Sequence, residues 1–373
     1  MNQRISEESK LERGEPVDPR LPWVRVVHDL AEARQVERPA ERIAALDHSG
    51  RALGDALRAG PMARGVRTLD VSALVYPTRF AFNGAVPLPW PYVVMKHRSL
   101  LVELDTPEGP KKLLFNPTDA DASQAGTPFF QGLTRELGRV APFAVDLIKR
   151  RNRPLVERLA ELGVRPEDID LLAFDHFHTQ DLRPLLGTAD RPSRFPNALL
   201  LAPAREWDHW GALHPMQRAW FVAEGRDGVP LDRVVLTDGD LALGDGALLL
   251  STPGHTVGNQ TLFVHGAEGV FGFCENGCSA DSWSPRSSTI VGLRRYAEQY
   301  GVDVVLNANT PELGGEQYAS MMLERAVVDA VPNDPEAVQM FPSSEVTWTP
   351  LAPGVRPRTL FEHRDSGSIT ATP

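Results

Sequence analysis

The stretch that most constrains the fold of this chain is a short apolar run that ends in two histidines. Residues 169–174 are apolar apart from Asp170, a pattern that predicts a buried strand. His176 and His178 follow, and because they are two residues apart their side chains point the same way from an extended backbone. Two neutral imidazoles at a strand end can begin a metal site, since imidazole binds zinc, iron and nickel. The alternative is a structural or surface pair.

Length and charge restrict the class of protein. The chain has 373 residues, enough for one large domain with extensions or for two modest domains. Its 39 basic and 49 acidic side chains give a net charge of −10, which argues against nucleic acid or an anionic membrane surface as the main partner. No run of 18 apolar residues predicts a membrane span, and residues 1–8 lack the apolar core of a signal peptide.

The cysteine content predicts a reducing compartment. Only Cys274 and Cys278 occur, which are too few for a disulfide framework, and a bridge between residues four apart would be unusual. We therefore expect a cytoplasmic protein. Both thiols are expected to be buried structural groups rather than ligands, because cysteine is among the most buried residue types.

Composition along the chain suggests three parts. Residues 1–65 are expected to form a polar arm and a helical extension, with helices from Trp23 to Leu57 that are broken at Pro39 and at Ser49–Gly50. These helices are the candidate contact for a homo-oligomer. Residues 66–331 carry alternating strand and helix patterns and form the expected main domain, and residues 332–373 form a Pro-rich tail.

The patterns of the main domain predict α/β architecture. Strands are expected at 69–76, 92–95, 100–104, 112–115, 197–201, 234–236, 247–251, 261–264, 269–273 and 302–306, with short tail strands at 345–349 and 359–361. Helices are expected within 128–162, where Gly163 ends the last one, and at 182–186, 286–300 and 315–330. Residues 203–230, dense in Trp, His and Met at their start, indicate either a helical pair packed on the sheet or a cap over a substrate pocket.

Polar side chains stand at the ends of four of these strands. The first end carries His176, His178 and Asp181, and the others carry His255, Glu275 and Asn309. Because sites in α/β proteins gather at strand ends, these side chains are expected to converge.

This order of strand ends resembles the metallo-β-lactamase fold superfamily over roughly residues 66–330. The most specific part is Thr252-Pro253-Gly254-His255-Thr256-x-Gly258, which resembles the third metal-ligand loop of that family. The approach to His176 and the hairpin at Asp105–Gly109 also match. The resemblance implies a four-layer αββα sandwich, in which two sheets stack face to face with helices outside and metals sit at one sheet edge. A helical segment after the first motif is most similar to the lactonase-like branch.

The first motif departs from the family pattern His-x-His-x-Asp-His, because here it reads His176-Phe177-His178-Thr179-Gln180-Asp181. By the resemblance, His176, His178 and His255 bind the first metal. The groups that the family would place on a second metal become Gln180, Asp181, Glu275 and Asn309.

The resemblance implies a metal-dependent hydrolase. Three imidazoles and a water form an open tetrahedral site that lowers the pKa of the water to about 7, so that metal-bound hydroxide can attack an ester, lactone, amide or thioester carbonyl. We expect zinc, with one ion rather than two, and we expect Glu275 to complete the first site or act in catalysis. Asp181 is expected to act as a second ligand, as a general base or as a group that orients a histidine. Carboxylate and amide oxygens at a second site would favour harder ions such as manganese.

Two alternatives belong to other classes. Histidine and carboxylate ligands also suit iron, which would make the protein an iron-dependent oxidoreductase. The altered second set instead suggests a binding protein that keeps the fold and has lost the reaction. The apolar, Trp-rich stretch 203–221 suggests a small, partly apolar molecule as the substrate. His209 and His214 are expected to be surface histidines.

Overall fold

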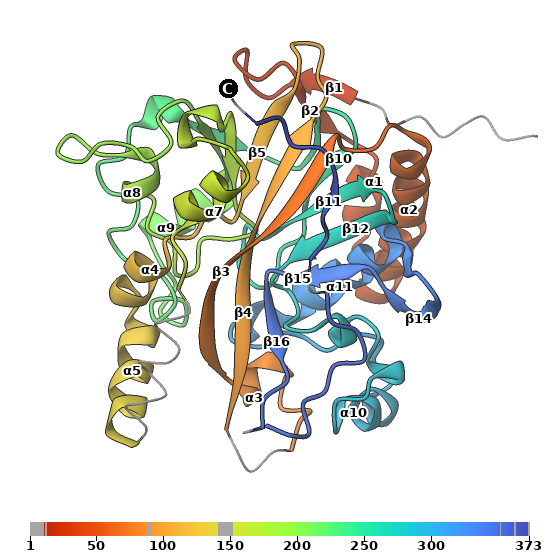
Figure 1. The fold of residues 1–373 in the computed structure, drawn as a ribbon. Coiled ribbons are helices and arrows are strands. Elements are labelled where there is room, and N and C mark those ends of the chain that lie inside the picture. The colour runs from red at the N-terminus through yellow and green to blue at the C-terminus, as the bar shows by residue number, and fades with distance from the viewer. Residues whose placement is uncertain are drawn as a thin grey trace, which may run out of the picture.

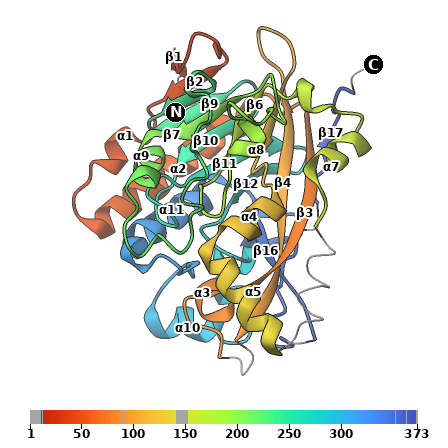
Figure 2. The same ribbon diagram turned by 90° about the vertical axis from the view of Figure 1, so that its left-hand side faces the viewer.

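Two β-sheets face each other at the centre of the protein, and helices cover their outer faces (Figures 1 and 2). The computed structural model describes residues 11, 13–87, 91–140, 152–350, 352–361 and 363–371. In their order across the sheet, the strands of the first sheet are β1 (Arg13–Pro16), β2 (Val24–Val27), β9 (Asp240–Leu243), β10 (Ala247–Ser251), β11 (Gln260–Gly266), β12 (Gly269–Cys274) and β15 (Met340–Pro342).

The second sheet is built around two long strands. In order, its strands are β17 (Ser366–Gly367), β3 (Gly65–Pro77), β4 (Tyr92–Leu104), β5 (Lys111–Phe115), β6 (Leu171–Ala173), β7 (Leu199–Pro203) and β8 (Val234–Thr237). A further strand, β16 (Ser344–Thr347), pairs with the first half of β4, and β13 (Ala330–Val331) and β14 (Asp334–Val338) form a separate pair. The β4–β5 pair is the predicted hairpin, and the pairs from β5 to β8 are parallel. The loops after β5, β6 and β7 therefore leave the sheet at one edge.

Apolar side chains from both sheets form the central core. Phe115 of β5 packs edge-on against Phe273 of β12 with 5.9 Å between ring centroids, and Phe273 in turn contacts Phe341 at 5.0 Å. These residues belong to one cluster of buried side chains to which both sheets contribute. Burial of this apolar surface is what holds the two sheets face to face.

Helices pack on the outer face of each sheet. The α-helices are α1 (Ala31–Arg34), α2 (Pro39–Ala59), α3 (Thr78–Ala81), α4 (Ala120–Gly126), α5 (Pro128–Val140), α7 (Leu155–Glu161), α8 (Arg183–Leu186), α9 (Ala204–Gly211), α10 (Leu293–Tyr300) and α11 (Gly314–Val327). The short 3₁₀ turns are η1 (Pro166–Asp168), η2 (Leu231–Arg233), η3 (Ala280–Ser282), η4 (Pro285–Ser287) and η5 (Pro311–Leu313). Helices α1, α2 and α11 share a buried cluster with the first sheet, and α7, α8 and α9 share another with the second. The expected four-layer αββα sandwich is confirmed.

The helical extension differs from its prediction at Gly50. This glycine lies inside one continuous helix, α2, and does not break it. The reason is close packing on α11: a Cβ at Gly50 would lie 2.8 Å from Leu323 Cδ1, and one at Gly54 would lie 2.3 Å from the Val327 carbonyl oxygen. The apolar face of α2 is thus buried within the same chain, and an oligomer formed through this helix remains a prediction.

The helix predicted from Trp23 is wrong at its start, because residues 24–27 form strand β2, which pairs with β9. Val24 faces the core between the sheets and Val27 faces α2. Apolar residues three apart fit either one face of a helix or the two faces of a strand that is buried on both sides. Here the segment forms a strand because it pairs with β9.

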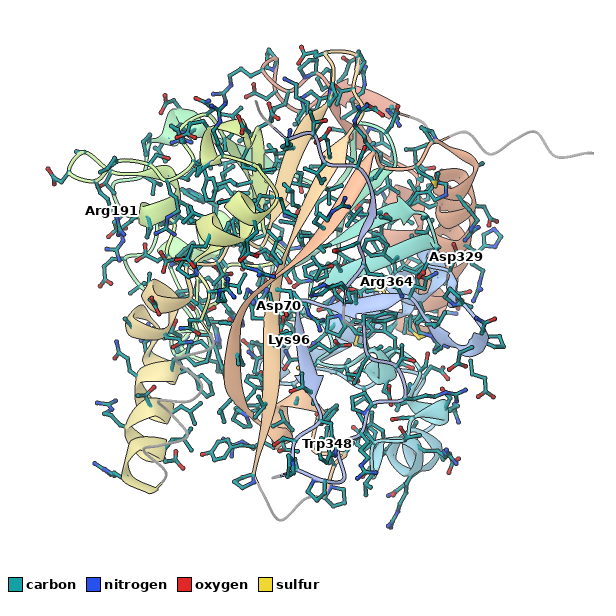
Figure 3. All side chains as sticks on the ribbon, in the orientation of Figure 1. Asp70, Lys96, Arg191, Asp329, Trp348 and Arg364 are labelled. Carbon is teal, nitrogen blue, oxygen red and sulfur yellow. The ribbon has the colours of Figure 1, made fainter. Side chains whose placement is uncertain are left out.

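The tail also contributes to the sheets, through β15, β16 and β17. Arg364, labelled in Figure 3, forms an ion pair with Glu268 at 2.6 Å and lies over the Phe361 ring at 4.2 Å, which attaches the last residues to the body of the protein. The division into 1–65, 66–331 and 332–373 remains a prediction, but strands from both outer parts belong to the sheets.

Other predictions also need correction, among them the helix predicted at 286–300, which begins only at Leu293 as α10. The strands predicted at 302–306 and 359–361 are absent, because neither segment pairs with another strand. The first segment makes isolated backbone hydrogen bonds, such as the one from Val305 N–H to the Ser282 carbonyl. In the 203–230 stretch only α9 is an α-helix, and consecutive turns follow it. The part of the predicted helix at 141–151 lies outside the described residues. Within the described ranges, no helix is both long and apolar enough to cross a membrane.

Candidate metal centre

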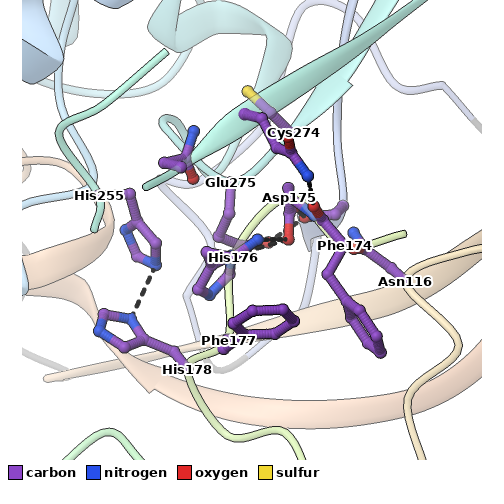
Figure 4. Close-up of polar contacts among 12 residues, drawn as sticks. Asn116, Phe174, Asp175, His176, Phe177, His178, His255, Cys274 and Glu275 are labelled. Atoms are coloured by element: carbon purple, nitrogen blue, oxygen red, sulfur yellow. Dashed lines mark hydrogen bonds and ion pairs between the residues drawn. The ribbon is translucent and has the colours of Figure 1, made fainter. Parts of the chain in front are cut away.

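Three histidines converge where the loops after β6 and β10 meet (Figure 4). His176 and His178 leave the carboxyl end of β6, while Phe177 between them is fully buried in the core. Ring centroids lie 4.4 Å apart for His176 and His255, 4.9 Å for His178 and His255, and 5.0 Å for His176 and His178. One nitrogen from each ring lies within 4.8 Å of the other two. The predicted convergence of the three imidazoles is therefore present.

His176 turns its second nitrogen to a carboxylate. Its Nδ1 lies 2.7 Å from Asp175 Oδ1, and Asp175 is itself held by Ser343 Oγ at 2.6 Å and, through its backbone N–H, by Asn116 Oδ1 at 2.9 Å. Burial lowers the pKa of His176, but the Asp175 carboxylate outweighs burial and the net shift is upward. Because Nδ1 is occupied, Nε2 is the nitrogen left to face the other rings.

His178 turns its second nitrogen to an amide. Its Nε2 lies 2.6 Å from Gln217 Oε1, and its Nδ1 lies 3.2 Å from His255 Nε2. Burial, reinforced by His176, lowers the pKa of both His178 and His255 well below the usual value, which keeps these rings in the neutral form that binds metals. Sequence reasoning missed Gln217, because nothing in the sequence marks it except its place in the Trp-rich stretch.

The His255 loop has the shape that its sequence predicted. Gly254 has φ of +148°, and a Cβ there would lie 2.2 Å from Gln317 Cα, so only glycine fits. Thr310 Oγ1 donates to the His255 carbonyl at 2.8 Å, and Asn276 Oδ1 accepts from the His255 N–H at 3.2 Å. These contacts hold the imidazole in place while its Nδ1 remains buried without a hydrogen-bond partner.

A buried carboxylate joins the two histidine loops. Glu206 of α9 has no exposed surface, and its oxygens accept from Phe177 N–H at 3.1 Å and from Gly258 N–H at 2.9 Å. A Cβ at Gly258 would lie 2.5 Å from Glu206 Cβ, which accounts for the glycine that ends the His255 motif. Sequence reasoning missed this residue as well, because it comes from a helix that no motif marks.

The residues predicted for a second ion are not arranged as one group. Asp181 is bound by Arg183 through Nε at 2.9 Å and Nη2 at 2.8 Å, and it does not line the cavity beside the histidines. Gln180, Glu275 and Asn309 do line that cavity. Within the described residues, the histidine triad is the only cluster of imidazole, thiol or carboxylate groups close enough to share an ion. The roles proposed for Asp181 remain predictions that this placement does not favour.

Glu275 is tied to the support of His176. Its Oε2 accepts from Ser343 Oγ, the hydroxyl that also contacts Asp175. Burial, together with the Asp175 charge, raises the pKa of Glu275 from 4.5 to about 8. Asn309 Oδ1 is buried without a hydrogen-bond partner. Both side chains therefore stand at the cavity, but neither joins the triad in one cluster.

The cavity beside the triad has a polar floor and apolar walls. The floor includes the three histidines of the triad, Glu275 and the amides of Gln180 and Asn309, and further polar side chains, among them His97, Thr118 and Ser344, also line the cavity. The walls are Leu74, Tyr76, Met95, Phe130 and Trp220, which come from β3, β4, α5 and the turns after α9. Trp220 lies 6.0 Å from the His178 ring and 4.3 Å from Phe129, so aromatic side chains continue the wall away from the floor. The Trp-rich stretch therefore shapes the cavity through Trp220, whereas the helical pair predicted for it is reduced to the single helix α9.

The remaining expectations concern residues outside the triad. Cys274 and Cys278 are buried free thiols, and neither lines the cavity. His214 is exposed, and neither it nor His209 lines the cavity. The triad fits a divalent ion, because its facing nitrogens are close together, its rings are buried and two of the three outer nitrogens already have partners.

No family model matches the chain, and no curated protein sequence matches it. Several solved structures resemble it. A probable metal-dependent hydrolase from Staphylococcus aureus is 13% identical with a TM-score of 0.44, and the match covers 57% of this chain and 73% of that one. A quorum-quenching N-acyl homoserine lactone lactonase is 14% identical with a TM-score of 0.42, and the match covers 65% of this chain and 89% of that one.

A third similar structure, the hydrolase AbOPH in the beta lactamase superfamily, is 12% identical with a TM-score of 0.46, and the match covers 83% of this chain and 98% of that one. At these identities and TM-scores, the matches say nothing about the reaction, which has to be inferred from the residues of the site.

Proposed function

We propose that this protein is a metal-dependent hydrolase that binds one divalent ion, zinc, through His176, His178 and His255. The observation that carries the proposal is the convergence of three buried imidazoles whose facing nitrogens lie within 4.8 Å of one another. A zinc ion bound by three histidines supplies a Lewis acid and lowers the pKa of a water ligand to about 7.

The protein's own residues would orient and enclose the substrate. A carbonyl compound such as an ester, lactone, amide or thioester would place its reacting group on the polar floor and its apolar part between Leu74, Met95 and Trp220. Among the described residues that line the cavity there is no lysine or arginine, which favours an uncharged, partly apolar substrate over a phosphate ester. Glu275 is the candidate proton-transfer group, because it is the only carboxyl group among those lining residues.

Metal analysis of the purified protein, followed by a hydrolysis screen over lactones, esters and thioesters, tests the proposal. We expect about one equivalent of zinc and zinc-dependent turnover of a neutral substrate. Bound iron with visible absorbance would replace the proposal with the oxidoreductase alternative. A metal-free protein with native secondary structure, to which added zinc does not bind, would favour a binding protein.

A further inference from the structure

We infer that Gln217 is a positioning residue of the metal centre, whose amide oxygen holds His178 in the tautomer that presents Nδ1 to the ion. The inference rests on the proposed function for its consequence, which is tight metal binding. Its structural part, the tautomer of His178, is a property of the metal-free protein.

The orientation of the Gln217 amide follows from its two neighbours. Its Nε2 lies 2.8 Å from Glu312 Oε1, and its Oε1 lies 2.6 Å from His178 Nε2. A carboxylate only accepts hydrogen bonds, so the amide nitrogen must face Glu312 and the amide oxygen must face the imidazole. His178 Nε2 must then carry the hydrogen.

The consequence for His178 is that Nδ1 keeps its lone pair. A neutral imidazole carries one hydrogen, and the nitrogen without it is the one that can bind a metal. Nδ1 is the nitrogen that faces the rest of the triad, 3.2 Å from His255 Nε2. The Gln217 contact therefore selects the metal-binding form of the ring before any ion arrives.

Gln217 is held firmly enough to do this. It is 1% exposed, its backbone N–H donates to the His214 carbonyl at 2.9 Å, and its carbonyl accepts from Trp220 N–H at 2.9 Å. The Trp220 carbonyl in turn accepts from Thr179 N–H at 2.7 Å. Because Thr179 directly follows His178, this chain of bonds docks the turn that carries Gln217 onto the histidine loop.

His176 and His178 are oriented by different chemistry. Asp175 holds His176 through Nδ1 and leaves Nε2 facing inward, whereas Gln217 holds His178 through Nε2 and leaves Nδ1 facing inward. Because the two rings turn different nitrogens inward, opposite tautomers are needed for both to bind one ion. Gln217 supplies the second of these without adding a further charge to the site.

Nitrogen-15 NMR of the metal-free, histidine-labelled protein tests the tautomer directly. The His178 signals are assigned by their absence in His178→Ala. We expect the wild type to be protonated at Nε2, and Gln217→Met, which keeps the side-chain volume but lacks the acceptor, to populate the Nδ1–H form that can donate to His255. The matched control is Gln339→Met, which removes another buried glutamine, whose side-chain Nε2 donates to the Glu268 and Ala330 carbonyls. An unchanged His178 tautomer in Gln217→Met overturns the inference.

Zinc affinity, measured by competition with a chromophoric chelator, tests the consequence. Loss of a partner of a metal-binding histidine typically lowers metal affinity about 10- to 100-fold, and we expect Gln217→Met to fall in this range while Gln339→Met binds as the wild type does. The visible spectrum of the cobalt-loaded protein should change in Gln217→Met only. Equal zinc affinity in wild type and Gln217→Met, with the tautomer shifted, would remove the positioning role.

A second variant covers the case in which Gln217→Met folds poorly. Glu312 is exposed, so Glu312→Ala should leave the fold intact while freeing the amide to turn over. We expect a smaller loss of zinc affinity than in Gln217→Met, and unchanged affinity would contradict the orientation argument. If the wild type binds no zinc, the proposed function fails, whereas the NMR result still decides whether Gln217 sets the tautomer.

Discussion

The site has an imidazole half, formed by His176, His178 and His255, and a carboxylate–amide half, formed by Gln180, Asp181, Glu275 and Asn309. The two halves differ in which atoms of their side chains are held by neighbouring residues. In the imidazole half, the partners of His176 and His178 occupy their outer nitrogens and leave the inner nitrogens facing one point. In the other half, the Asp181 carboxylate accepts a hydrogen bond from Arg183, and the Glu275 carboxyl group accepts one from Ser343. Supporting contacts thus prepare the first half for an ion and engage both carboxyl groups of the second.

This difference explains why a single ion is the simplest proposal. A ligand needs a free lone pair aimed at the ion as well as the right chemical type. Gln180 and Asn309 line the cavity, but amide oxygens are weak ligands for zinc. Glu275, the one carboxyl group among the described lining residues, is bound to Ser343 and does not join the triad in one cluster.

The largest expected effect comes from removing an imidazole. His178→Ala should lower the zinc content from about one equivalent to near zero, because two histidines and water hold the ion far less well than three. Circular dichroism should show the sandwich still folded, since the sheets form their core elsewhere. His214→Ala, which removes an exposed histidine outside the cavity, should bind zinc normally. Unchanged zinc content in His178→Ala would discard the assignment.

The next effect concerns what holds the imidazole half together. Glu206→Ala leaves the Phe177 and Gly258 N–H groups buried without an acceptor, which should lower the free energy of unfolding by about 4 kcal/mol. Urea unfolding of the metal-free protein measures this loss. Asp208→Ala on the exposed side of the same helix is the control and should change stability little. Similar stabilities for the two variants would show that the loops do not depend on Glu206.

A buried carboxyl beneath the His255 loop should give the protein a pH-dependent stability. Glu324 accepts from Asn276 Nδ2 at 2.6 Å and Trp283 Nε1 at 2.7 Å, and burial raises its pKa from 4.5 to about 7. The folded state therefore holds this proton at a higher pH than the unfolded chain. The stabilisation is complete below pH 4.5 and is lost as the pH rises through about 7, a change of about 3 kcal/mol.

Comparison with Glu324→Gln isolates this contribution. The free energy of unfolding, measured in chelator at pH 5 and pH 7.5, should fall more steeply with pH in the wild type than in the variant. Parallel pH profiles would mean that Glu324 titrates normally in the folded protein.

The smallest effect is expected in the second half. Asp181→Asn breaks the ion pair with Arg183, which is partly exposed and should be worth no more than about 1 kcal/mol. Zinc affinity should change less than threefold, because Asp181 is not brought to the triad. A large loss of zinc in this variant, measured with the same chelator competition, would return Asp181 to the ligand set and erase the contrast between the halves.

Local patterns in the sequence predicted most of the long strands and the strand-end histidines, whereas the αββα class came from the resemblance of the strand-end motifs to a known superfamily. Alternating apolar residues mark strands because successive side chains point to opposite faces, and Gly254 marks the His255 loop because no Cβ fits there. Where a local pattern fitted two structures, as at residues 24–27, pairing with a distant strand decided the outcome.

The tertiary structure alone decided which groups support the histidines and which potential ligands are occupied elsewhere. Gln217 is 39 residues from His178, and Ser343 is 168 residues from Asp175, so nothing local connects them. The sequence shows which types of ligand are present, because the chemistry of a side chain is fixed by its own residue. Whether a lone pair is free and aimed at an ion depends on contacts that form only when distant segments pack together.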